Sequence, residues 1–436
     1  MKKIVASVAL VAVGASGLQA DLLPGLTSES GKPWTAAATL RGFYDDNFNT
    51  APNDVPIAHR ATFGFEISPS IQFSFPMEQT SISFGYVYSL KYYEYKPLNN
   101  SDNYDQTHEF DVALTHAFSE RYQVSVRDSF VIGQEPDFLR AGNTYTTFER
   151  ISGDNMRNYG SITLAAQLTP DISLELGYAN TFYSYADTAN LNANGTFAQA
   201  SNAGLLDSVD QVVHLDARYQ FAPQTTAVVG YQFRETDYTG DQQIGVDPTR
   251  NRIIVSDELN ARSHYLYAGL DHNFLPDLTG SFRLGGRYTD YYNNPAGQSD
   301  LSPYAQASLR YTYLPESYLE AGFSYDYSSS SVFSVDQTTG DLTLNAQSAT
   351  VYVALNHRIM PKLYGSILAQ FQNSTYYGGG YDGDTDKYYL VGLNLQYRFT
   401  PNFSAEVGYN YDDLHSDLPG RTYDRNRIYV GVTGSY

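Results

Sequence analysis

A strand pattern that stops at a short turn and then resumes is the feature that most constrains this fold. In "LNLQYRFTPNFSAEVGYNYDD", apolar and polar residues alternate, stop at Thr400-Pro401-Asn402 and alternate again. Proline suits such a turn because its ring fixes φ and no sheet hydrogen bond is required of it there. Similar segments surround five further prolines, which are Pro170, Pro223, Pro276, Pro315 and Pro361. The chain is therefore predicted to consist of repeated β-hairpins.

Counting the turns predicts the number of strands. Pro76 marks a seventh short turn, and "FSERY" at Phe118 marks an eighth without proline. Eight short turns join sixteen strands, and a first strand near 34–45 and a last at 425–436 give eighteen, or sixteen to twenty if a hairpin is misassigned. The remaining connections are long and hydrophilic, and they are expected at 46–59, 96–106, 135–156, 187–208, 239–260, 293–302, 329–347, 377–386 and 414–424.

Short and long connections alternate strictly, and this asymmetry indicates a membrane protein. Outer-membrane barrels have short turns on the periplasmic side and long extracellular loops. Only a closed barrel satisfies every backbone polar group in lipid without leaving a free edge. A secreted β-propeller or a set of sandwiches is the alternative, but neither requires the short connections to fall on alternate hairpins. The predicted fold is all-β, a single transmembrane antiparallel up-and-down β-barrel.

The N-terminal segment predicts the destination of the chain. In "MKKIVASVALVAVGASGLQA", Lys2 and Lys3 precede an apolar stretch that ends in small residues, as in a secretory signal peptide. We expect a signal peptide at 1–20, a periplasmic lead at 21–33 and a barrel at 34–436, in the outer membrane of a Gram-negative-type bacterium. Without Lys2 and Lys3 the chain has 25 basic and 47 acidic residues, a charge of −22. This balance argues against a nucleic-acid partner, because phosphate binding needs basic patches.

Strand alternation assigns each side chain to lipid or to the lumen. Leu393, Leu395 and Val407 are expected to face lipid, and Asn394 and Gln396 are expected to face water. A lumen-side glycine followed by an outward aromatic residue recurs at Gly85-Tyr86, Gly177-Tyr178, Gly230-Tyr231, Gly322-Phe323 and Gly408-Tyr409. Glycine weakens a strand unless its space is needed, so neighbouring rings are expected to lie over these positions.

Charged residues recur at fixed distances from the turns, on the lumen side near the periplasmic mouth. The glutamates are Glu175, Glu320 and Glu406, and the arginines are Arg218, Arg310, Arg358 and Arg398. One interpretation is a charged ring that selects solutes. The other, which the pattern favours, is that opposite charges on neighbouring strands pair and hold the wall together.

The sequence carries no pattern that predicts an enzyme or a cofactor site. It has no cysteine, no His-x-x-x-His spacing, no Gly-x-Ser-x-Gly elbow and no phosphate-binding or dinucleotide-binding fingerprint. Asp382, Asp384 and Asp386 alternate in "YDGDTDKYY" and are the one weak calcium candidate, because calcium takes oxygen ligands. An acidic, solvated loop is the more common meaning of such a segment.

Two segments near the N-terminus resemble a known family. "LRGFYDDNFNTAP" at Leu40 and "RATFGFEISPSIQFSFPMEQTSISFGYVYSLKYYEY" at Arg60 are similar to the putative beta-barrel porin 2 family of outer-membrane proteins. The resemblance implies a channel, and it carries no catalytic residues to this chain. Barrels of this size usually leave an aqueous lumen, so we expect a passive channel for small hydrophilic solutes with a modest cation preference. The alternative is a barrel that serves export, for example of polysaccharide, or surface structure and adhesion.

Two further features concern the pore and the assembly of the barrel. The connection 135–156 is rich in apolar residues and is expected either to fold into the lumen or to pack on the rim, and its charged constriction candidates are Asp137, Arg140, Glu149 and Arg150. The chain ends on Tyr436, and a terminal aromatic residue resembles the signal of barrels inserted by the outer-membrane assembly machinery. Expected partners are therefore membrane lipid and that machinery, and a homo-oligomer is compatible with the sequence.

Overall fold

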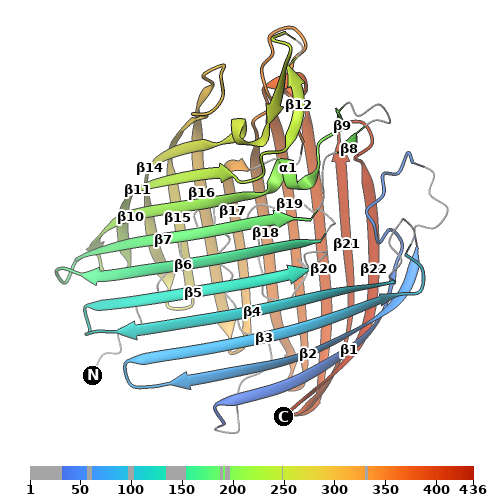
Figure 1. Ribbon diagram of the computed structural model, residues 1–436. Coiled ribbons are helices and arrows are strands. Elements are labelled where there is room, and N and C mark those ends of the chain that lie inside the picture. Colours follow the sequence, from blue (N-terminus) through green and yellow to red (C-terminus); the bar gives the residue numbers. More distant parts are fainter. Residues whose placement is uncertain are drawn as a thin grey trace.

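The computed structural model describes residues 32–55, 61–96, 103–133, 154–186, 190–191, 197–247, 249–328 and 332–436. Within them, eighteen antiparallel strands form one closed sheet, so the predicted fold and strand count are confirmed (Figure 1). The barrel strands are β1 (Trp34–Asp45), β2 (Thr62–Pro76), β3 (Thr80–Tyr93), β4 (Tyr104–Ala117), β5 (Tyr122–Gly133), β6 (Asn155–Gln167), β7 (Ile172–Tyr185), β10 (Ser208–Ala222), β11 (Thr225–Tyr238), β14 (Ala261–Leu275), β15 (Leu278–Asp290), β16 (Ser299–Leu314), β17 (Ser317–Ser328), β18 (Asn345–Met360), β19 (Leu363–Tyr377), β20 (Thr385–Thr400), β21 (Phe403–Ser416) and β22 (Tyr423–Ser435). No helix in the described part of the chain is long and apolar enough to cross a membrane.

The short turns lie where the sequence predicted them. In five hairpins the turn is one proline and one further residue, and the prolines are Pro223, Pro276, Pro315, Pro361 and Pro401. In each of the five, the strand register shifts close to the turn. Proline supplies the φ that the second residue of a tight turn requires, and the register shift absorbs the strong local twist.

The long connections differ from expectation in length and in content. β4 begins at Tyr104 and β16 at Ser299, inside segments expected to be loop, because strands continue beyond the membrane where both faces can carry polar residues. Three connections also contain structure of their own. Their elements are β8 (Asn190–Leu191), β9 (Phe197–Gln199), α1 (Asn202–Leu206), β12 (Gln243–Asp247), β13 (Arg252–Val255), η1 (Ser256–Leu259) and η2 (Gly379–Tyr381).

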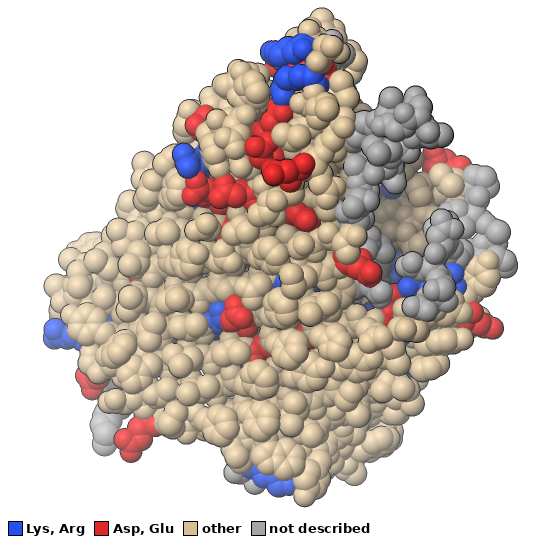
Figure 2. All heavy atoms as spheres, in the orientation of Figure 1, with Lys and Arg blue, Asp and Glu red and all other residues tan. Residues whose placement is uncertain are grey.

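The predicted assignment of faces is confirmed. Leu395 and Val407 keep 40% and 45% of their surface exposed on the outside of the barrel. On the inside, Asn394 donates to Glu406 Oε2 at 3.0 Å, and Gln396 lies within 3.4 Å of Ser404 Oγ. The outer face formed by β2–β7 is almost free of charged side chains, as a lipid-facing surface requires (Figure 2).

Pairing of β1 with β22 closes the barrel, and buried charges reinforce the closure. Residues 37–45 lie opposite residues 427–435 in reverse order. Asp45 is fully buried and accepts hydrogen bonds from Arg425 Nε and Arg427 Nε, each at 2.9 Å. Removing one member of a buried ion pair leaves an uncompensated charge, which makes this contact costly to break. The two ends of the barrel are thus joined by a backbone ladder and by charges across it.

The face assignment predicts unequal costs for the same substitution on the two sides of one strand. Leu395→Arg places a cation in the hydrocarbon region and should destabilise the barrel by about 2–4 kcal/mol at midplane depth. Gln396→Arg is the matched control, because it faces the lumen beside Glu406 and should cost less. Urea unfolding of both variants in liposomes measures the difference, and equal costs would contradict the assignment.

Candidate functional site

The inner wall of the barrel is polar, and it is the surface that a solute would meet. Register partners in an antiparallel sheet share one face, so a row of partners can be followed from strand to strand around the wall. One lumen-side row runs through Glu175, Asp216, Gly230, Tyr267 and Gly285 on five neighbouring strands. Two carboxylates, two glycines and a tyrosine therefore lie side by side on this part of the wall.

Two of the predicted glutamates form ion pairs with predicted arginines. Glu320 on β17 lies opposite Arg310 on β16, and Arg310 Nη1 is 3.1 Å from Glu320 Oε2. Glu175 on β7 is reached diagonally by Arg218 on β10, whose Nη2 lies 3.2 Å from Glu175 Oε2. These contacts match the interpretation in which opposite charges on adjacent strands pair and hold the wall.

Glu406, the third predicted glutamate, takes part in the barrel seam. Its Oε1 accepts a hydrogen bond from Arg41 Nε at 2.6 Å, although their strands, β21 and β1, are separated by β22. The contact passes over Gly431 of β22, where a Cβ would lie 2.8 Å from Arg41 Cγ. Sequence reasoning missed Arg41, because its partner is 365 residues away in the chain.

Arg358 and Arg398 converge on one turn residue. Arg358 Nη1 lies 3.1 Å from Glu316 Oε2, and Arg398 Nη1 lies 3.9 Å from Glu316 Oε1. Glu316 follows Pro315 in the turn and has a φ of 60°. The Arg398 guanidinium also lies 4.1 Å from the centre of the Tyr364 ring. All seven predicted lumen charges thus have an oppositely charged neighbour. For Arg358 and Arg398 this neighbour is Glu316, which lies in a turn and so could not be found from the strand pattern.

A second set of lumen charges lies higher on the wall and was not predicted. Arg283 on β15 is almost fully buried, and its Nη2 is 2.8 Å from Asp271 Oδ1 on β14. Arg287 is four residues further along β15 on the same face, and its Nη1 lies 3.3 Å from Asp326 Oδ1 on β17. The sequence could have indicated both arginines, because strand alternation in "FRLGGRY" puts them on the lumen side. The charged lining therefore continues from the periplasmic mouth up the wall formed by β10–β17.

The predicted packing of rings over lumen-side glycines is confirmed for three tyrosines. The pairs are Gly230–Tyr267, Gly322–Tyr352 and Gly408–Tyr429. In the last pair, a Cβ on Gly408 would lie 2.1 Å from Tyr429 Cζ, so only glycine leaves room for the ring. The ring lies along the wall, and its hydroxyl accepts a hydrogen bond from Asn394 Nδ2 at 2.8 Å. At Gly177 the covering ring belongs to His214 instead.

Loops from three separate connections pack around one apolar core on the extracellular side. Leu205 of α1, Ile244 and Ile254 of the β12–β13 hairpin, and Val335 and Leu342 of the segment between β17 and β18 are all buried together. This corrects the expectation that these connections are simply hydrophilic. We call this assembly the loop cap, and it stands above the β10–β18 side of the barrel (Figure 1).

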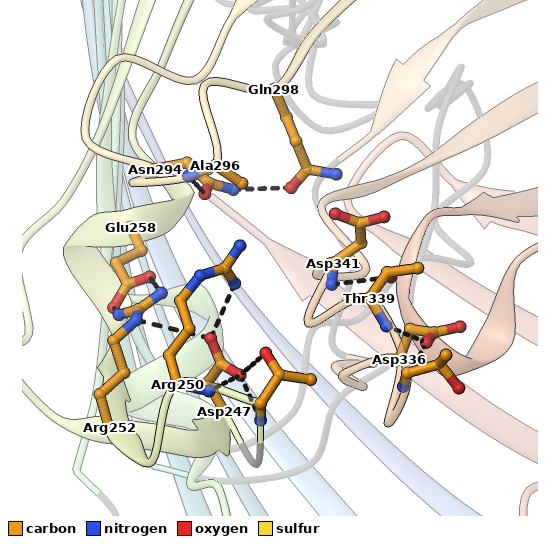
Figure 3. Close-up of polar contacts among 12 residues, drawn as sticks. Asp247, Arg250, Arg252, Glu258, Asn294, Ala296, Gln298, Asp336, Thr339 and Asp341 are labelled. Atoms are coloured by element: carbon orange, nitrogen blue, oxygen red, sulfur yellow. Dashed lines mark hydrogen bonds and ion pairs between the residues drawn. The ribbon is translucent and has the colours of Figure 1, made fainter.

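Polar contacts fix the tips of the loop cap (Figure 3). Asp247 accepts hydrogen bonds from Thr249 Oγ1 at 2.6 Å and Arg250 Nη1 at 2.9 Å, and these bonds hold the pKa of Asp247 well below its ordinary value. On the facing loop, a Cβ on Gly340 would lie 2.5 Å from Thr249 Oγ1 and 2.7 Å from Arg250 Nη1. The two tips therefore touch.

The three calcium candidates do not share one site. Asp386 Oδ2 accepts from Tyr376 Oη at 2.6 Å and lies 3.1 Å from Arg421 Nη2. Asp382 accepts from the backbone N–H of Gly378 at 2.9 Å, and Asp384 lies between the two in the chain. Across the residues that the structure describes, no group of three or more His, Cys, Asp or Glu side chains could hold a metal ion.

The remaining predicted residues are the constriction candidates and the C-terminal aromatic residue. Asp137, Arg140, Glu149 and Arg150 lie outside the described residues. Tyr436 is paired with β1 through two backbone hydrogen bonds to Ala36, at 2.8 and 3.1 Å. Its ring lies 5.7 Å from that of Trp34, and Lys32 Nζ lies 3.6 Å from its centre. The terminal residue thus extends the seam, while its role in assembly stays a prediction.

Comparison with known proteins supports the family resemblance. Residues 345–436 match the model of a family described as putative beta-barrel porin 2, which is the family that the segments near the N-terminus resemble. A search of curated protein sequences finds no match.

Several solved outer-membrane barrels are distantly similar to the whole chain. OccK1 (OpdK) of Pseudomonas aeruginosa has 14% identity over 92% of this chain and 99% of its own, with a TM-score of 0.43. A BenF-like porin from Pseudomonas fluorescens has 14% identity over 93% and 99%, with a TM-score of 0.46. The ferric enterobactin receptor PfeA of Pseudomonas aeruginosa has 11% identity over 92% and 80%, with a TM-score of 0.40. These similarities are too low to carry an argument about function.

The packing of rings over glycines predicts a stability cost for added side-chain volume. Gly408→Ala should destabilise the barrel by about 1–3 kcal/mol, because the new methyl group overlaps the Tyr429 ring. Gly42→Ala is the control, since a Cβ there meets no atom within 4 Å. Adding Tyr429→Ala should relieve the clash, so the Gly408→Ala cost should shrink in that background. Urea unfolding in liposomes measures all four proteins, and an unchanged Gly408→Ala cost would contradict the packing.

Proposed function

We propose that this barrel is a passive, porin-like channel of the outer membrane that admits small hydrophilic solutes. The observation that carries the proposal is a closed eighteen-stranded barrel with an apolar outer face and a polar inner face. Barrels of this strand number usually enclose a water-filled lumen. The family match at residues 345–436 agrees with this function.

The burial of the inner wall indicates where a solute passes. On β4 and β6, the lumen-side residues Thr107, Glu109 and Arg157 remain partly exposed. In the upper half of β18, beneath the loop cap, Ser348 and Thr350 are fully buried. The proposed passage therefore runs past these partly exposed residues of β4 and β6, whereas Ser129 and Val131 on the lumen side of the intervening β5 are buried. The proposed passage is off-centre, on the side that the loop cap leaves free.

The charge of the chain supports a modest preference for cations. After removal of the predicted signal peptide the chain carries a charge of −22, so its surroundings attract counter-cations. The lumen charges described above are largely paired, which weakens the field of any one carboxylate. Selectivity should thus be small, and it should fall at high salt as the charges are screened.

Planar-bilayer recording tests the proposed channel. The mature protein should give a steady conductance, and a KCl gradient should give a reversal potential of the sign expected for a cation-preferring pore. The preference should decline between about 0.1 and 1 M salt, as the Debye length falls from about 10 to 3 Å. A folded barrel that never conducts would contradict the channel proposal and favour an export-associated or structural barrel.

Single cysteines can locate the passage, because the chain has no cysteine of its own. Thr107→Cys should react with a charged, water-soluble thiol reagent, and the conductance should then fall. Thr350→Cys is the matched control, and it should be unreactive because Thr350 is fully buried. Equal block at both positions, or block at Thr350→Cys alone, would place the passage elsewhere.

A further inference from the structure

The lipid-facing side of β5 carries a carboxylate. Asp128 lies opposite Val112 on β4 and Gly160 on β6 in the sheet register. Register partners share a face, and Val112 is 39% exposed on the outside of the barrel. The next residue, Ser129, is buried on the lumen side. Asp128 therefore points outward, among residues that face lipid.

The position of Asp128 along its strand places it deep in the membrane. It is near the middle of β5, which has 12 residues, and a barrel strand crosses the hydrocarbon in about 9–11 residues. Other outward carboxylates of the described strands, such as Glu235 on β11 and Asp290 on β15, lie at extracellular strand ends. Ionisable residues inside the membrane are costly and mark functional contacts.

Asp128 is the centre of a small polar surface. Asn158 on β6 donates from Nδ2 to Asp128 Oδ1 at 3.0 Å. Gly160 leaves room for this pair, since a Cβ there would lie 3.1 Å from Asp128 Oδ1. Asn180 on β7 lies opposite Gly160 and adds a second amide. We call these four residues, which are Asp128, Asn158, Gly160 and Asn180, the polar notch.

We propose that the polar notch is the contact between two copies of this chain within the outer membrane. Each amide offers two N–H donors, and the carboxylate accepts several hydrogen bonds. Asn158 Nδ2 already donates to Asp128 Oδ1 and to Ser129 O, whereas Asn180 Nδ2 donates to Asp210 O at 3.4 Å and has a second N–H to offer. The surface is therefore self-complementary: across a two-fold axis, Asn180 of one copy donates to Asp128 of the other. Hydrogen bonds between polar side chains stabilise contacts between membrane segments.

Lipid is a poorer occupant of the same surface. Acyl chains provide no hydrogen-bond donor for Asp128, and the phosphates of lipid headgroups carry the same sign of charge as the carboxylate. The apolar rim of the notch, which includes Val112, Met156 and Ile162, is exposed and continues the contact area outward. A second copy supplies both the donors for the centre and an apolar rim that matches its own.

Disulfide trapping in isolated outer membranes tests the contact, whether or not the barrel conducts. Ile162→Cys lies beside the notch on the lipid side, and oxidation should give a dimer band on non-reducing gels. Val407→Cys is the matched control, because its exposure is similar and it lies on β21. Equal cross-linking at both positions would overturn the proposal, since it would reflect random collision.

A second measurement separates this contact from a failure to fold. The unmodified protein should be a dimer in mild detergent by light scattering, and Asp128→Leu should lower the dimer-to-monomer ratio at least about tenfold, as expected for lost hydrogen bonds to a charged group. Asp128→Asn should have a smaller effect. Heat-modifiability on gels confirms that each variant is folded. A monomeric parent protein, an Asp128→Leu variant with an intact dimer, or a parent that carries lipid or another protein at the notch would each overturn the proposal.

Discussion

Everything in this molecule depends on the requirement that no backbone N–H or C=O be left unpaired in hydrocarbon. A sheet meets that requirement only when its first and last strands pair, which here are β1 and β22. The side chains at this junction reinforce it, since Asp45 is held by two arginines near one end and Arg41 reaches Glu406 across Gly431 lower down. In the closed barrel the outer face meets lipid and the inner face meets water, so each strand must present apolar residues outward and polar residues inward.

The inner wall is built so that large polar side chains lie along it rather than project into the lumen. Tyrosine rings occupy the space that lumen-side glycines provide, and their hydroxyl groups pair with carboxylates or amides of the wall, as Tyr267 does with Asp216 at 2.6 Å. The charged residues behave in the same way, because arginines lie against acids on neighbouring strands. Such a lining keeps space free while pairing its charges across neighbouring strands. The loop cap then covers one side of the mouth, and on the other side Thr107, Glu109 and Arg157 of β4 and β6 are partly exposed.

Much of the fold could be predicted from the sequence because barrel strands are local patterns. Alternation and short turns predicted eighteen strands. The lipid-facing position of Leu395 and the lumen-facing position of Asn394 followed from the two-residue repeat of a strand. The partners of the charges could not be predicted in the same way, since Glu316 is in a turn and Arg41 is far from Glu406 in the chain. The loop cap was missed because its apolar residues, such as Ile254 and Leu342, are scattered among polar ones and meet only in space. The inward folding of 135–156 stays a prediction, because its central residues lie outside the described part of the chain.

The pairing of β1 with β22 also determines when the barrel can close during synthesis and export. Residues 37–45 find their partners only in 427–435, so the first strand waits for the last one to be synthesised and exported. Until then, alternating apolar residues of every strand are open to water and to other chains, which is a hazard for aggregation. Closure spans nearly the whole sequence, and contacts of such long range form slowly. The barrel therefore cannot close before its last strand has been exported, and pairing of β22 with β1 ends the interval in which apolar residues are unprotected.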